Sequence, residues 1–238
     1  MATFDSCVTE LGKHSAIAQM ANLRDKDFVI PENARSLVLS SYVASGGRSP
    51  VLVVTTTEEQ SQQTVKDLSK FLPELDISWF PAWETLPFER VSPAIETMGR
   101  RSEVLWKIRN GDPPEIIVAT SRSISQILAP NQFAGPIVLN PGETVNYETL
   151  ISQLSQYGYQ RTSQVERRGE YAVRGSIIDV YPSTSSTPIR LDVWGDEIER
   201  LTDFSVADQR SREAKKTVEI FPARELIPTE LVREEAKK

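Results

Sequence analysis

Val51-Leu52-Val53-Val54-Thr55 runs directly into Thr56-Thr57-Glu58-Glu59, and this stretch decides the fold of the first half of the chain. A short run of valine and leucine is typical of a buried β-strand. A threonine hydroxyl can cap the start of a helix, and glutamates suit the first helical turn. The stretch therefore predicts a strand followed by a helix. The inward face of that helix then carries Val65, Leu68 and Phe71 or Leu72.

The alternation of strand and helix extends on both sides of this stretch. Residues 36–40, 77–80 and 116–119 are short and apolar enough to predict further buried strands, and residues 96–109 predict a helix. Strands and helices in alternation favour a parallel sheet with helices on both faces. We therefore expect an α/β first domain over residues 1–133.

The pattern changes near residue 134. Residues 189–194 alternate between inward apolar and outward side chains, which is the pattern of a half-buried strand. Gly195-Asp196 supplies a turn, and residues 198–204 predict the returning strand. We therefore expect residues 134–222 to form a smaller α+β domain with a mostly antiparallel sheet.

The composition is that of an ordinary globular chain with an acidic excess. Hydrophobic residues make up 39%, charged residues 25%, and the net charge is −6. A protein that neutralises nucleic-acid phosphates usually has a basic excess on at least one face. No apolar run approaches the ~20 residues of a membrane helix, and the N-terminus lacks the order of a signal peptide. We expect a cytoplasmic protein without a membrane partner.

The chain offers little material for catalysis or metal binding. Cys7 is the only cysteine and His14 the only histidine, whereas structural zinc takes about four ligands mainly of these types. Both fall in a stretch that predicts an amphipathic helix rather than a catalytic pair. A phosphate-binding loop needs glycines, a lysine and a serine or threonine, and residues 40–49 contain no such lysine. We therefore expect no catalytic residue, cofactor, metal or ATP hydrolysis.

Two longer stretches carry a family resemblance. The first is FPAWETLPFERVSP at residues 80–93, followed by the glycine and two arginines of residues 99–101. The second is RRGEYAVRGSIIDVYP at residues 167–182, followed by RLDVWGDEIER at residues 190–200. Over residues 35–228 the chain resembles the N-terminal region of the bacterial transcription-repair coupling factors (Mfd). The second stretch is also similar to the damage-verification subunit UvrB.

The resemblance implies that the first domain is a degenerate RecA-like, helicase-like domain. Members of the UvrB family carry a phosphate-binding loop and a long DNA-clamping hairpin there. In this chain the loop lysine is missing, and only 18 residues separate Pro81 from Arg100, too few for the hairpin. The resemblance also implies that residues 223–238 begin a truncated return to the first domain.

The partners implied by the resemblance are UvrA for the second domain, and RNA polymerase and DNA for the remainder of the full-length family protein, an ATP-dependent DNA translocase. The implied function of this chain is non-catalytic recruitment of UvrA to stalled transcription complexes in nucleotide excision repair. The alternative is a nucleic-acid-binding, UvrB-like domain that contacts damaged DNA, with Arg100, Arg101 and the arginines of residues 161–174 in the contact. Solvated charge on a helix is the simpler interpretation of Arg100 and Arg101.

Residues 159–174 concentrate arginine and tyrosine, two residue types that are enriched at binding hot spots, in a chain that is acidic overall. Alternatively, these arginines pair internally with Glu166, Glu170, Asp192 or Asp196. In the family, arginines of this motif contact acidic groups on UvrA, which favours Arg168 and Arg174. The predicted UvrA-binding residues are Arg161, Arg167, Arg168, Tyr171, Arg174, Asp196 and Glu197.

These residues are expected to differ in role. Tyr171 either packs across the contact or points inward, and Asp196 and Glu197 are either rim contacts or solvated turn residues. Asp179 is expected to hold an arginine from within the sheet. The apolar side chains of residues 83–88 are expected to fold over the sheet edge or to meet another domain.

Overall fold

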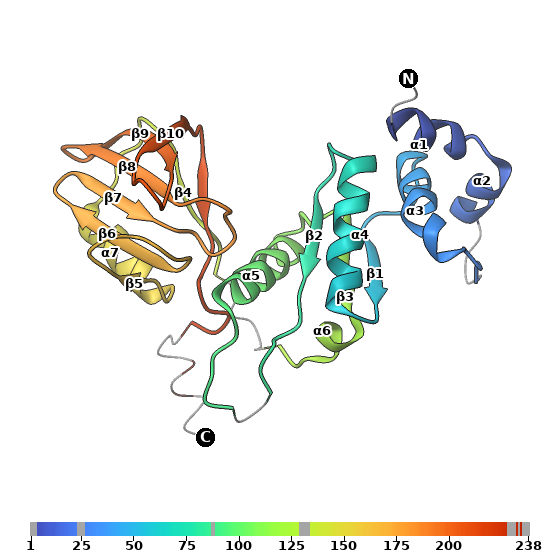
Figure 1. Cartoon of the computed structure of the whole chain (residues 1–238), viewed down its shortest axis with the longest axis horizontal. Helices are drawn as coiled ribbons and strands as arrows, with labels where there is room; N and C mark the ends of the chain where they lie inside the picture. The colour runs from blue at the N-terminus through green and yellow to red at the C-terminus, as the bar shows by residue number, and fades with distance from the viewer. Residues whose placement is uncertain are drawn as a thin grey trace. The chain divides into compact units, whose positions relative to one another are not determined.

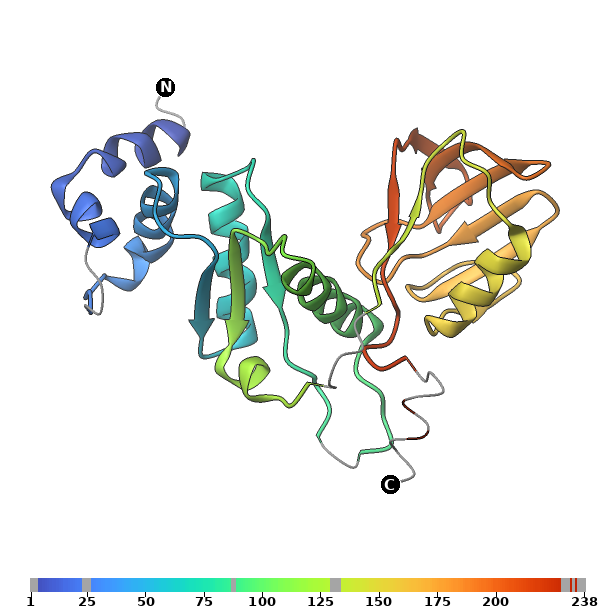
Figure 2. The same ribbon diagram turned by 180° about the vertical axis from the view of Figure 1, so that it is seen from behind.

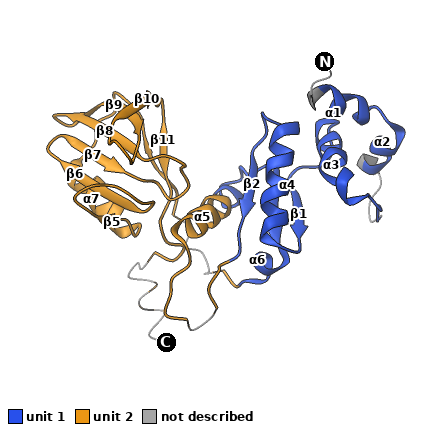
Figure 3. Ribbon diagram, in the orientation of Figure 1, with its two compact units in different colours: residues 1–82, 107–126 blue, residues 83–106, 127–238 orange. Residues whose placement is uncertain are grey.

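The computed structural model describes residues 4–22, 27–86, 89–128 and 134–227, together with residues 232 and 234 (Figure 1). The chain divides into two compact units (Figure 3). Unit 1 comprises residues 1–82 and 107–126, and unit 2 comprises residues 83–106 and 127–238. The domain boundaries at residues 133 and 222 stay predictions, and the compact units group residues 83–106 with the second half of the chain.

Unit 1 contains a three-stranded parallel sheet in the order β1-β3-β2. Its strands are β1 (Val51–Thr55), β2 (Ile77–Phe80) and β3 (Ile116–Thr120). Its helices are α1 (Phe4–Gly12), α2 (Ser15–Asn22), the 3₁₀ helix η1 (Glu32–Ala34), α3 (Arg35–Ala44), α4 (Glu58–Phe71) and α6 (Ser121–Ser125). The α/β prediction for the first half is confirmed.

The strand-to-helix stretch folds as the sequence predicts. Thr57 caps α4, and its hydroxyl accepts a hydrogen bond of 3.2 Å from the backbone N–H of Gln60. Leu68 of α4 is fully buried against Ile116 and Val118 of the central strand β3. The core of unit 1 therefore includes the space between α4 and one face of the sheet, and it extends to side chains of α1 and α3.

The prediction of a strand at residues 36–40 is wrong, because these residues lie in helix α3. Ser40 and Ser41 are buried, so two small side chains let α3 pack closely on its neighbours. The Ser41 hydroxyl donates to the carbonyl of Leu37 one turn earlier at 2.9 Å, which satisfies it without a strand partner. A run of five residues with three apolar side chains does not distinguish a strand from a helix turn.

The prediction that both faces of the parallel sheet are covered is also wrong for β1. Val51 and Val53 pack into the core, whereas Leu52 is 55% exposed and Val54 47% exposed on the opposite face. β1 is an edge strand, with β3 as its partner. The alternation of burial along β1 arises because successive side chains point to opposite faces, and at β1 the core covers one face only.

Unit 2 contains a six-stranded sheet in the order β10-β9-β8-β7-β6-β5, in which the β5–β6 pair alone is parallel. Its strands are β5 (Gln160–Arg161), β6 (Glu170–Arg174), β7 (Ile177–Val180), β8 (Ile189–Trp194), β9 (Glu197–Phe204) and β10 (Ser211–Ala214). A second sheet pairs β4 (Ile137–Leu139) with β11 (Val218–Ile220). The predicted α+β class with a mostly antiparallel sheet is confirmed.

Helix α7 (Tyr147–Gln156) covers one face of the large sheet, as Figures 1 and 2 show from opposite sides. Leu150 and Leu154 of α7 pack on that face. The sheet residues beneath them form rows across the strands, such as Val173, Ile178, Leu191 and Leu201. Because side chains alternate along a strand, the neighbouring rows must face away from α7.

Helix α5 (Ile95–Arg109) begins in unit 2 and ends in unit 1. The Ser183 side chain lies so close to Gly99 of α5 that a β-carbon at this position would collide with its hydroxyl oxygen. The ring of Trp106, also on α5, meets that of Phe221 edge-on, with centroids 5.9 Å apart. These contacts make residues 95–106 part of the body of unit 2.

A buried ion pair fastens this part of α5 to the segment that follows β11. The Nε of Arg101 donates to an oxygen of Glu225 at 2.7 Å, and the Arg101 side chain is 0% exposed. The indole N–H of Trp83 donates to the same oxygen at 2.8 Å, and the Arg101 guanidinium lies 5.5 Å from the Trp83 ring centroid. The interpretation of Arg101 as solvated helix charge is therefore wrong. Of the apolar side chains at residues 83–88, Trp83 packs into unit 2, whereas Leu86 is exposed. Pro87 and Phe88 lie outside the described residues.

We expect Glu225→Ala to lower the free energy of unfolding by about 3–5 kcal/mol, because it removes the carboxylate that neutralises a buried guanidinium. Urea titration followed by tryptophan fluorescence measures the change. Glu10→Gln is the control, since it breaks the exposed Lys13–Glu10 pair and should cost less than about 1 kcal/mol. Equal effects of the two substitutions would contradict the role of the buried pair.

Tyr159 provides a second buried polar contact in unit 2. Its hydroxyl donates to the carbonyl of Phe221 at 2.7 Å and accepts from the backbone N–H of Ser183 at 2.9 Å. Burial raises the pKa of Tyr159 from 10.0 to about 12. The stability that comes from keeping this phenol neutral is present below pH 10 and is lost as the pH rises through about 12.

Tyr159→Phe should cost about 1–3 kcal/mol near neutral pH, because it leaves the buried N–H of Ser183 without its partner. The difference between the wild type and this variant should then shrink between pH 10 and pH 12. Urea midpoints measured across that range test the expectation. A difference that stays constant with pH would show that the phenol does not titrate as its burial requires.

Candidate docking surface

Most of the charged side chains of the large sheet lie on the face that points away from α7. One row across the strands is Arg174, Ile177, Asp192 and Arg200. The next outward row is Ala172, Asp179, Arg190 and Thr202. At the far end of that face, Val165, Ala172 and Phe204 form a small buried cluster with Tyr181. The end near Arg174 has no such cover among the described residues.

Asp179 is the anchor of this outward face. Its carboxylate is 0% exposed and receives hydrogen bonds from two arginines. The Nη2 of Arg174 donates to Oδ2 at 2.5 Å, while Arg190 donates from Nε to Oδ1 at 2.7 Å and from Nη2 to Oδ2 at 2.9 Å. The prediction that Asp179 holds an arginine within the sheet is confirmed, and it holds two.

The two arginines differ in how firmly they are held. Arg190 also donates to the carbonyl of Gln209 at 3.1 Å, lies 4.7 Å from the Phe204 ring centroid, and has a side chain only 12% exposed. Its hydrogen bonds with Asp179 raise the pKa of its guanidinium further above the usual range. The Arg174 side chain, by contrast, is 44% exposed. Arg174 therefore presents a fixed positive charge to solvent.

Trp194 lies at the same end of the sheet as Arg174. It lies two residues after Asp192 on the outward face of β8 and is 79% exposed. Its pairing partner across the β8–β9 turn is Glu197, and both line a shallow hollow of about 440 Å³ with Glu199. We refer to Arg174, Ile177, Asp192, Trp194, Glu197 and Arg200 as the outer patch.

The predicted site residues do not all lie together. Arg174, Asp196 and Glu197 share one end of the sheet, because the β6–β7 and β8–β9 turns lie side by side there. Arg167 precedes β6 and Arg161 pairs beside Tyr171, so both lie toward the other end of β6. The length of β6 separates the two groups by about 13 Å, at about 3.3 Å per residue.

Arg168 is engaged within unit 2. Its Nε donates to the carbonyl of Ser185 at 2.8 Å, its Nη1 lies 3.0 Å from Glu96 of α5, and its guanidinium lies 5.6 Å from the Tyr181 ring centroid. Arg168 is therefore paired internally, but with Glu96 and not with any of the four carboxylates that the sequence suggested. Tyr171 points inward: it is 3% exposed, and its hydroxyl meets that of Ser155 on α7 at 3.0 Å.

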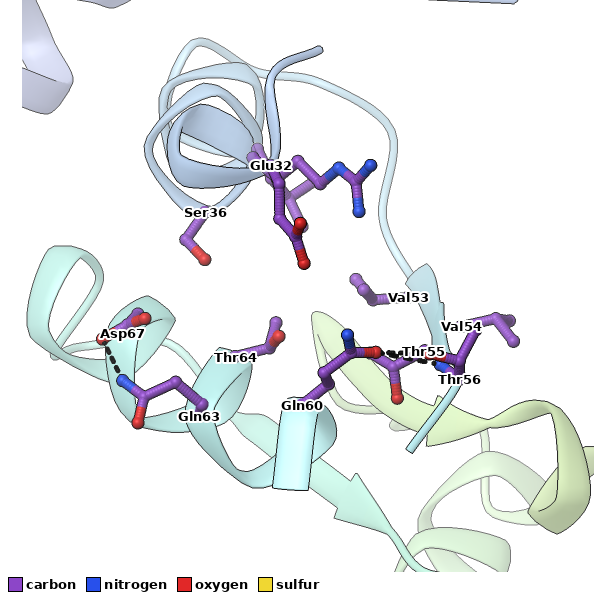
Figure 4. Close-up of a pocket in the computed structure, with 12 residues that line it drawn as sticks. Glu32, Ser36, Val53, Val54, Thr55, Thr56, Gln60, Gln63, Thr64 and Asp67 are labelled. Carbon is purple, nitrogen blue, oxygen red and sulfur yellow. Dashed lines mark hydrogen bonds between the residues drawn. The ribbon is translucent and has the colours of Figure 1, made fainter. Parts of the chain in front are cut away.

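Unit 1 holds a separate cleft of about 320 Å³ at the carboxyl end of β1, where α/β sheets commonly bind ligands. Figure 4 shows Gln60 hydrogen-bonded to Thr56 and Gln63 to Asp67 on one side, with Glu32 and Ser36 opposite. The lining of this cleft includes two carboxylates, Glu32 and Asp67, and one arginine, Arg35. This charge balance does not suit a nucleotide phosphate, which needs cationic and N–H donors.

Comparison with known proteins places the outer patch in a recognised domain. Residues 137–226 match the family model of the UvrB interaction domain. The chain is 37% identical over 217 residues to the transcription-repair-coupling factor of Mycobacterium tuberculosis, covering 87% of this chain and 17% of that protein. The Bacillus subtilis and Escherichia coli factors are 32% identical over 197 residues and 29% identical over 199 residues, covering 82% and 83% of this chain and 17% of each protein.

The chain is a relative of the transcription-repair-coupling factors. Its UvrB interaction domain runs from β4 to just beyond β11 and includes the whole outer patch. The chain spans about 17% of the length of the curated relatives that it matches. Within the described residues, no helix is long and apolar enough to cross a membrane.

Trp194 and Arg190 were missing from the residues predicted for the site. Both belong to the alternating strand at residues 189–194, which already predicted that they face away from the core. The sequence gives no measure of how much cover an outward side chain receives. Here Asp179, Phe204 and Gln209 cover most of the Arg190 side chain, whereas Trp194 stays 79% exposed.

Trp194 should dominate the tryptophan fluorescence that a neutral quencher reaches, because Trp79, Trp83 and Trp106 are half-buried. We expect Trp194→Phe to remove the component most strongly quenched by acrylamide while leaving the melting temperature nearly unchanged. A quenching curve unaffected by Trp194→Phe would contradict the exposed position of this ring.

Proposed function

We propose that this chain is a non-catalytic docking module that binds UvrA through the outer patch of its UvrB interaction domain. In the whole protein this contact would recruit UvrA to stalled transcription complexes in nucleotide excision repair. The observation that carries the proposal is an exposed tryptophan at the same end of the sheet as an arginine held in place, within the domain that matches the UvrB interaction family.

The composition of the outer patch supports a protein partner. Tryptophan and arginine are the residue types most enriched at hot spots, where a few residues carry most of the binding energy. Trp194 adds a large apolar surface, and Arg174 adds a fork that pairs with a carboxylate. The adjacent Asp196 and Glu197 are exposed and would form a rim of opposite charge.

Arg161 and Arg167 are exposed toward the other end of β6, and we propose them as outlying contacts that add less affinity. Arg168 would contribute by holding its loop against α5 rather than by direct contact. Tyr171 would support the sheet from within. RNA polymerase and DNA would bind the remainder of the whole protein.

The nucleic-acid alternative receives less support. Arg101 is buried against Glu225, and Arg100 is paired with Glu96 at 2.8 Å. The outer patch also mixes two carboxylates, those of Asp192 and Glu197, with its two arginines, and the chain has a net charge of −6. Phosphate binding favours a surface with a clear positive excess.

Calorimetric titration of the chain with purified UvrA tests the proposal. Saturable binding is expected, and Arg174→Ala and Trp194→Ala should each weaken it about 30-fold, the equivalent of about 2 kcal/mol. Lys70→Ala on α4 is the control, because it removes an exposed cation from unit 1 and should leave the affinity unchanged.

Melting curves must show that each variant is folded. A folded wild-type chain that fails to bind UvrA would refute the docking function. Binding that is equally strong in both outer-patch variants would refute the location of the surface while leaving the function intact.

A further inference from the structure

We propose that Asp179 is a positioning residue for docking: it holds the Arg174 guanidinium in the orientation in which its free donors meet a single carboxylate of the partner. This inference rests on the proposed function and assigns a role to a residue that the partner itself does not touch. It follows from burial, from the division of donors between the two arginines and from the strand register.

The first step concerns the burial of Asp179. Its side chain is 0% exposed, and burying a lone carboxylate is strongly unfavourable unless hydrogen-bonded cations surround it. Arg190 lies directly opposite Asp179 on β8 and binds both of its oxygens. Arg174 occupies the adjacent outward row on β6 and binds one of them. The carboxylate is therefore held in one orientation from two strands.

Arg190 and Arg174 differ in the partners that hold their side chains besides Asp179. Arg190 keeps further partners in Gln209, Ser211 and the Phe204 ring. Within the described part of the chain, the Arg174 side chain has one hydrogen bond, the one that it donates to Asp179. Loss of Asp179 would therefore release Arg174 while Arg190 stays in place.

The third step concerns the donors that remain on Arg174. A guanidinium has five N–H donors, and the bond to Asp179 uses one of its Nη2 hydrogens. With 44% of the side chain exposed, the other donors can form the two parallel bonds of an arginine–carboxylate pair. A partner acid would add to the bond with Asp179 rather than replace it, because Asp179 lies beneath the face. Fixing the side chain before binding reduces the entropy lost in the complex.

Asp179→Asn tests this role because it keeps the shape of the side chain and removes its charge. We expect a roughly tenfold loss of affinity for UvrA although Arg174 is still present. The double variant Asp179→Asn/Arg174→Ala should bind no more weakly than Arg174→Ala alone, since both changes act through the same guanidinium. Asp203→Asn is the matched control: Asp203 is a largely buried, ion-paired aspartate of β9, and it is bound by Lys215 away from Arg174.

Arg174→Lys gives a second test that does not disturb a buried group. The lysine keeps the positive charge but lacks the planar guanidinium, so it cannot bind Asp179 and at the same time form two parallel hydrogen bonds with a partner carboxylate. We therefore expect an affinity close to that of Arg174→Ala. Wild-type affinity in Arg174→Lys would overturn the inference, as would unchanged or increased affinity in Asp179→Asn. If the losses of affinity caused by Asp179→Asn and Arg174→Ala add in the double variant, Asp179 acts through the fold alone and not through Arg174. That result would also overturn the inference. Absence of binding by the folded wild-type chain would instead refute the proposed function, and the inference with it.

Discussion

The buried carboxylate of Asp179 is the constraint around which the outward face of unit 2 is organised. It lies within the sheet at 0% exposure, and such a charge is tolerated because two guanidinium groups reach it from neighbouring strands. Because of this requirement, Arg190 of β8 and Arg174 at the end of β6 are both held against Asp179. The exposed charge of the proposed docking surface is therefore a consequence of a buried one.

The second constraint is the buried pair of Arg101 and Glu225, which joins α5 to the segment beyond β11. Trp83 donates to the same carboxylate, so the segments around residues 83 and 101 both contact a residue more than 120 positions later in the sequence. Residues 83–106 consequently belong to the body of the docking unit, although their place in the sequence is within the first half. Arg168 extends this connection by bonding Glu96 of α5.

Much of this fold could be predicted from the sequence, and the errors have physical causes. The strand at residues 189–194 and the cap at Thr57 depend on local chemistry, and both are confirmed. The helix α3 was mistaken for a strand because buried serines obscure its period. Arg101 was interpreted as surface charge because its partner lies 124 residues away, and no local pattern reveals that distance. The alternation at residues 189–194 predicts that Trp194 faces away from the core, but it does not predict that 79% of the residue is exposed, because that depends on which other segments pack nearby.

The most direct test of the account is amide hydrogen exchange of this chain with and without UvrA, read out peptide by peptide. We expect slower exchange at the β6–β7 turn, residues 174–177, and at the β8–β9 turn, residues 194–197, because both turns carry residues of the outer patch. Unit 1, including the cleft beside β1, should exchange at the same rate in both samples. Protection confined to unit 1, or to residues 161–168 alone, would contradict the proposed docking surface.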